Sequence, residues 1–66
     1  MTPKYPDITV QLTGTDGNAF AVLGAVLAAL RQAGVPAEER KAFQQEATAG
    51  TYDQLLRVVM RWVEVD

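Results

Sequence analysis

The chain is 66 residues long, 48% of its residues are hydrophobic and 21% are charged, and its net charge is −2. This composition is typical of one globular domain and excludes an intrinsically disordered protein. The sequence has no Cys and no His, which excludes disulfides and the usual zinc, haem and iron–sulfur sites. We therefore expect no metal and no cofactor, and a small domain that depends on apolar packing or on association for its stability.

The first six residues include two prolines and little apolar character, so residues 1–6 are predicted to form a flexible arm. A single α+β domain is predicted over residues 7–66. In residues 7–12, Ile8, Val10 and Leu12 alternate with polar residues, which is the pattern of a half-buried strand.

A polar turn that contains Gly14, Asp16, Gly17 and Asn18 separates this strand from the first predicted helix. Backbone amides at such a junction can bind phosphate. The segment lacks the lysine and the spacing of a phosphate loop, however, and Asp16 would repel an anion. We therefore interpret it as a structural turn, in which Asp16 or Asn18 caps the helix.

The first helix, predicted over residues 18–32, contains twelve successive residues without a polar side chain, Ala19–Leu30. Gly34 is expected to end it in a left-handed conformation, with Pro36 beyond. The apolar residues cover more than the stripe of about 100° that a one-sided helix buries, so part of the helix is expected to form an interface. The small residues that would allow close approach of a partner are Ala21, Gly24, Ala25 and Ala28.

The apolar run is shorter than the roughly 20 residues that a membrane span requires. No basic-then-apolar leader is apparent in the first residues. We therefore expect a soluble, cytoplasmic protein without a membrane partner.

A second helix is predicted over residues 36–47, with Pro36 at its first position and Phe43 as its apolar anchor. The third helix is predicted to begin at Thr51, which forms a capping box with Gln54. Its apolar stripe consists of Leu55, Val58, Val59 and Trp62.

Arg57 and Arg61 lie on the opposite side of the third helix and are candidate contacts to an acidic partner or to phosphate. Asp53 precedes Arg57 by four residues, so an ordinary exposed ion pair is the favoured interpretation. Residues 63–65 alternate again and predict a second strand that pairs with the first. The predicted fold is thus β-α-α-α-β, a two-stranded sheet packed against three helices, and the strand direction stays open.

Most of the chain carries a pattern of short segments, which are Leu12–Gly14, Asp16–Phe20, Ala33–Val35, Phe43, Glu46–Ala47, Gly50, Tyr52–Asp53, Leu55–Leu56 and Trp62–Val63. This pattern resembles a group of small uncharacterised proteins encoded in bacterial genomes and sometimes in phages. The resemblance implies no activity and no site residues, because the group has no assigned function.

We expect a non-enzymatic interaction protein that binds another protein or a second copy of itself. The alternative is a nucleic-acid-associated regulator, which the net negative charge disfavours. Its phosphate contacts would be Arg40, Lys41, Arg57 and Arg61. A carboxylate-dependent enzyme is the least favoured hypothesis, because only Asp16 and Asp53 support it and no His or Cys is present.

Overall fold

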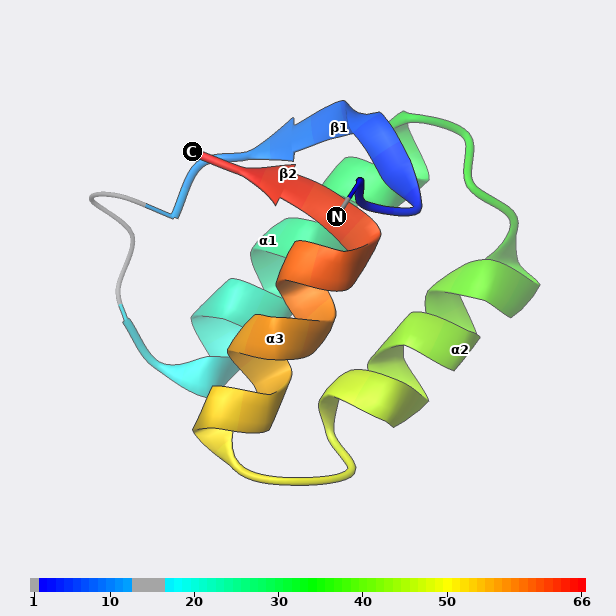
Figure 1. Cartoon of the computed structure of the whole chain (residues 1–66). Coiled ribbons are helices and arrows are strands. Elements are labelled where there is room, and N and C mark those ends of the chain that lie inside the picture. The colour runs from blue at the N-terminus through cyan, green and yellow to red at the C-terminus, as the bar shows by residue number, and fades with distance from the viewer. Residues whose placement is uncertain (1, 13–16) are drawn as a thin grey trace.

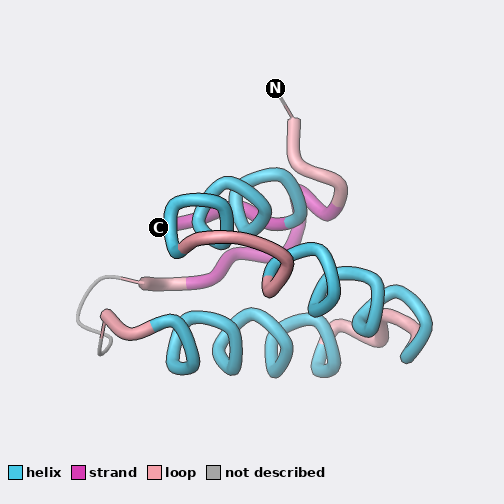
Figure 2. Tube along the Cα trace, turned by 90° about the horizontal axis from the view of Figure 1, so that it is seen from below, coloured by secondary structure: helices cyan, strands magenta, loops and turns pink. Residues whose placement is uncertain are grey.

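The computed structural model describes residues 2–12 and 17–66. Its elements are β1 (Tyr5–Val10), α1 (Ala19–Gln32), α2 (Ala37–Ala47), α3 (Tyr52–Trp62) and β2 (Val63–Val65). The predicted α+β fold, with the order β-α-α-α-β and a two-stranded sheet, is confirmed. The sheet lies at one end of the helices, α3 lies in front of α1, and α2 lies beside them (Figure 1). Figure 2 shows that α1 and α3 occupy opposite sides of the molecule.

The two strands run parallel, a direction that the sequence left open. Tyr5 pairs with Val63, Thr9 with Glu64 and Val10 with Val65, and the register shifts between Tyr5 and Thr9. Parallel strands need a long crossover connection. Here the three helices together form that connection, so both strands enter the sheet from the same end (Figure 1).

The first strand begins earlier than predicted, which corrects the expectation of an arm over residues 1–6. Tyr5 and Pro6 belong to β1, and the backbone N–H of Lys4 donates to the carbonyl of Arg61 at 2.8 Å. The Tyr5 ring stacks on Trp62, with the ring centroids 6.0 Å apart. The prolines obscured this strand in the sequence, because proline cannot donate to the ladder and is therefore a weak strand signal.

The cap of α1 is Asn18, one of the two predicted candidates. The Asn18 side chain accepts a hydrogen bond from the backbone N–H of Ala21 at 2.8 Å. The other candidate, Asp16, and the turn residue Gly14 lie outside the described residues.

Gly34 ends α1 as predicted, with φ +83°. The N–H of Gly34 donates to the carbonyl of Arg31 at 3.1 Å, and the N–H of Val35 donates to the carbonyl of Leu30 at 3.0 Å. These two bonds form a Schellman motif, which satisfies two of the last carbonyls of the helix. Pro36 is the N-cap of α2 and not its first helical residue, so this helix begins one residue later than predicted.

The core draws on one face of every element. The predicted stripe of α3 and the predicted anchor Phe43 are all buried. The Trp62 ring packs edge-on against Phe43, with the centroids 5.5 Å apart. The buried residues are Val10, Val22, Val26, Leu30, Val35, Phe43, Ala47, Leu55, Val58, Val59, Trp62 and Val63.

Candidate functional site

One side of α1 stays exposed although almost the whole helix is apolar. Val22, Val26 and Leu30 face the core, since they follow one another at intervals of four residues. The residues two positions before each of them, Phe20, Gly24 and Ala28, are exposed. We call these three residues the outer face of α1. Phe20 is 86% exposed, which is far more than a phenylalanine retains when its ring packs within a core.

The predicted interface residues on α1 differ in their exposure. Gly24 and Ala28 lie on the outer face, whereas Ala21 and Ala25 are half-buried at its edge. Phe20 was not among the predicted interface residues. A signal was present in the sequence, because Phe20 precedes Gly24 by one turn and therefore shares its side of the helix.

Gly24 has no packing role within the described chain. Apart from the backbone of its own helix and its chain neighbours, a Cβ added there would meet no atom of the described residues within 4 Å. Glycine inside a helix nevertheless costs about 0.5–1 kcal/mol relative to alanine. Gly24 therefore adds no stability to the monomer. Its missing side chain would, however, allow a second surface to pack closely against the helix backbone.

A hollow of about 580 Å³ adjoins the C-terminal half of α1. We call it the Arg31–Arg40 hollow, and its lining residues are Leu27, Ala28, Arg31, Gln32 and Arg40. The Nε atom of Arg40 is buried without a hydrogen-bond partner among the described residues. This Nε atom has almost no exposed surface, so an occupant of the hollow can contact only other atoms of the Arg40 side chain.

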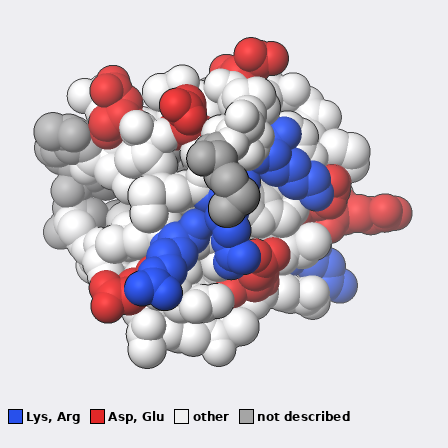
Figure 3. Space-filling model, viewed as in Figure 1, with Lys and Arg blue, Asp and Glu red and all other residues white. Residues whose placement is uncertain are grey.

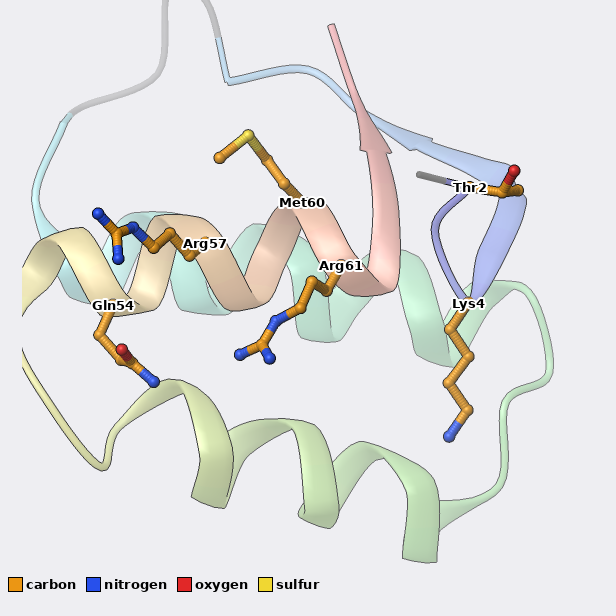
Figure 4. A pocket seen from close by; sticks show the side chains of 6 residues that line it. All are labelled: Thr2, Lys4, Gln54, Arg57, Met60 and Arg61. Carbon is orange, nitrogen blue, oxygen red and sulfur yellow. The ribbon is translucent and has the colours of Figure 1, made fainter.

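A second surface, the α3 groove, lies on the other side of the molecule. It measures about 770 Å³ and is lined by Thr2, Lys4, Gln54, Arg57, Met60 and Arg61. Gln54 and Arg61 extend from α3 toward α2, whereas Arg57 and Met60 extend from the other side of the helix (Figure 4). Figure 3 shows Lys and Arg side chains across this face, with Asp and Glu side chains among them.

Acidic neighbours neutralise two of the three cations in the α3 groove. Arg61 pairs with Glu46 at 3.0 Å, and Lys4 pairs with Glu39 at 2.8 Å. The expected Asp53–Arg57 ion pair is absent, and Arg57 makes no ion pair with any described residue. Asp53 and Arg57 are both exposed, so competition from bulk water means that an ion pair between them would contribute little to stability.

The groups predicted to bind phosphate do not form one patch. Arg57 and Arg61 line the α3 groove, whereas Arg40 lines the hollow beside α1. Helices α1 and α3 bury their apolar stripes against a shared core, so their outer faces point away from each other (Figure 2).

The N-terminal segment is tied to α2 by a charged and aromatic cluster. Glu39 accepts from the Lys4 ammonium at 2.8 Å and from the Tyr5 hydroxyl at 3.2 Å, and the Lys4 ammonium lies 4.3 Å from the centre of the Trp62 ring. The hydrogen bond from Lys4 lowers the pKa of Glu39 and raises the pKa of Lys4. The pKa of Tyr5 is raised, mainly by desolvation and to a lesser extent by the hydrogen bond to Glu39. These contacts give the cluster a structural role.

The catalytic candidate Asp53 lies beside Tyr52 in the first turn of α3. The Tyr52 hydroxyl donates to the carbonyl of Gly17 at 2.6 Å, which holds the start of α1 against the start of α3. Asp53 is exposed, and Asp16 lies outside the described residues. Within residues 2–12 and 17–66, no three acidic side chains are arranged so that they could hold a metal ion.

The described helices include none with the length and apolar character needed to cross a membrane. Comparison with protein-family models, with curated proteins and with solved structures finds no significant match to this chain. The resemblance to small bacterial and phage-encoded proteins therefore stays a prediction.

Proposed function

We propose that the chain is a small, non-enzymatic interaction protein that binds a protein partner, or a second copy of itself, through the outer face of α1. The observation that carries this proposal is Phe20, an 86% exposed aromatic ring on an uncharged stripe of helix. Aromatic side chains are enriched at interfaces, because they bury a large area at a small cost in conformational entropy. The open backbone at Gly24 supports the same surface, since a partner can approach it closely.

A photoreactive phenylalanine analogue at position 20 tests this proposal in the host cell. Irradiation is expected to give an adduct of defined mass, identified by mass spectrometry, that disappears when Gly24→Arg is introduced into the same chain. The matched control carries the analogue at Met60, which is 55% exposed on the opposite side of the molecule, and is expected to give no such adduct. Equal adducts from both positions, or none from position 20, would contradict the proposal.

The alternative function is nucleic-acid association through the α3 groove. Arg57 favours it, because this guanidinium makes no ion pair among the described residues. The pairing of Lys4 and Arg61 with carboxylates weighs against it, as does the net charge of −2. This alternative requires binding to DNA or RNA that weakens steeply with salt and that Arg57→Glu reduces. Absence of any mobility shift at low salt would exclude it.

We propose that the chain has no catalytic activity, no cofactor and no membrane partner. A cytoplasmic location and a bacterial or phage source are consistent with this proposal. If the chain comes from a mobile element, its partner would be a host protein, an idea that rests on the resemblance of the sequence alone.

A further inference from the structure

We propose that the partner at the outer face of α1 is a second copy of this chain, packed antiparallel so that each Phe20 enters the Arg31–Arg40 hollow of the other copy. This inference rests on the proposed function and adds to it the identity of the partner and the geometry of the contact.

The spacing along α1 would place Phe20 of one copy near the hollow of the other in an antiparallel pair. Phe20 and Ala28 each lie four residues from Gly24, about 6 Å along the helix axis at a rise of 1.5 Å per residue. A two-fold axis through Gly24 therefore places Phe20 of one copy opposite Ala28 of the other. Such an axis produces the same contact twice, which is the isologous arrangement of most homodimers.

The hollow is large enough to take the protruding ring. The hollow measures about 580 Å³ and includes Ala28 in its lining. A cavity of roughly 150 Å³ already accommodates a benzene ring, so one phenylalanine side chain fits with room for adjustment. Phe20 lies outside the core of its own copy, so its ring can enter the hollow without losing packing there.

The chemistry of the hollow also suits an aromatic ring. Leu27 and Ala28 provide apolar contact, and Arg31 and Arg40 provide guanidinium groups. A guanidinium over an aromatic face gains a cation–π attraction of about 0.5–2 kcal/mol.

Gly24 allows the helices to approach at the two-fold axis. Packed helices usually lie about 8–10 Å apart, at a distance set by the side chains between them. Each copy has open space where a Cβ at Gly24 would stand, within the described part of the chain. Close approach at the centre therefore brings both rings into reach of both hollows.

The contact is small, so the dimer is expected to be weak. A helix of 14 residues is about 21 Å long. The area that two such helices bury is well below the roughly 1,600 Å² of a standard interface. We therefore expect dissociation in the micromolar range or above, and sedimentation must extend to millimolar protein.

Engineered thiols test the geometry directly, because the sequence contains no cysteine. The variants are Phe20→Cys and Ala28→Cys, one of them isotopically labelled, oxidised separately and as a mixture. An antiparallel dimer brings the thiol at position 20 next to the thiol at position 28 of the other copy. Two copies of the same variant instead hold their thiols about 12 Å apart along the axis, too far for a disulfide.

The mixture is expected to give mainly the mixed disulfide, and each variant alone is expected to give several-fold less. The mixed dimer also retains one of the two Phe20 contacts.

The outcomes that contradict the inference are distinguishable. If Ala28→Cys alone forms a disulfide as readily as the mixture, the copies pack in parallel; the antiparallel geometry is then wrong, although α1 remains the interface. If the unmodified chain is a monomer at millimolar concentration while the analogue at position 20 captures a different protein, the inference is overturned and the proposed function survives. A monomer that captures nothing overturns both.

Discussion

At the scale of single residues, Glu39 joins the N-terminal segment to α2. It accepts from Lys4 and Tyr5, both of which lie beside Trp62. Because these bonds favour an ionised carboxylate, the pKa of Glu39 is lowered in the folded chain. A group with a lowered pKa stabilises the folded state above its unfolded pKa and loses that contribution as the pH falls.

Glu39→Gln is therefore expected to reduce the acid sensitivity of the fold. In the parent chain, the Glu39 contribution is present at neutral pH and is lost as the pH falls below about 4.3, where an unperturbed glutamate titrates. The difference in urea midpoint between neutral and strongly acidic pH should be smaller in Glu39→Gln. The control is Glu38→Gln, which removes an exposed carboxylate from the same helical turn without removing the bonds of Lys4 and Tyr5 to Glu39. Equal pH dependence of Glu39→Gln and the parent would contradict the assigned role.

At the scale of elements, α1 contains one glycine within it and one just beyond its end, and they have opposite roles. An added Cβ would meet no described atom within 4 Å at either Gly24 or Gly34. The two glycines differ in backbone conformation, because Gly34 has φ +83°, whereas Gly24 lies within the helix. Gly34 is needed for the Schellman motif that ends α1, and Gly24 lowers the stability of the helix without a contact in the described monomer.

Alanine at the two positions is expected to change stability in opposite directions. Gly24→Ala should raise the free energy of unfolding of the monomer by up to about 1 kcal/mol, through helix propensity. Gly34→Ala should lower it by about 1–2 kcal/mol, the cost of a side chain in a left-handed conformation. Urea unfolding at micromolar protein measures both. Loss of stability in Gly24→Ala would show that something packs on the glycine within the monomer.

At the scale of the whole molecule, stability depends on a few large side chains where α2, α3 and β1 meet. Phe43 is fully buried and packs edge to face with Trp62, which also stacks on Tyr5. A domain of this size has a total stability of roughly 3–10 kcal/mol. Truncating a buried phenylalanine to alanine typically costs about 3–5 kcal/mol.

Phe43→Ala is therefore expected to unfold much of the protein at 25 °C, whereas Phe20→Ala should leave the monomer folded. The two residues share one side-chain type and differ in exposure, 0% for Phe43 and 86% for Phe20. Phe20→Ala should change the free energy of unfolding by no more than about 0.5 kcal/mol. Circular dichroism during thermal unfolding distinguishes them. A large loss of stability in Phe20→Ala would mean that the ring packs on its own chain.

Local patterns in the sequence determined the helices and their ends. The stripe of α3 has a helical period, Asn18 and Thr51 cap the helix that directly follows each of them, and Gly34 takes a conformation that glycine allows most easily. Each of these features depends on residues within about one helical turn, so spacing alone is sufficient to predict it. The order of the elements could also be predicted, because the hydrophobic period of each segment distinguishes helix from strand.

Only the tertiary structure decided the direction of the strands, the start of β1 and the exposed side of α1. Pairing of Tyr5 with Val63, or of Arg61 with Glu46, joins residues distant in sequence that no local pattern connects. In α1 nearly every residue is apolar, so periodicity cannot say which side the core covers. Packing against the sheet and the other helices buries Val22, Val26 and Leu30, and it leaves Phe20 and Gly24 open to a partner.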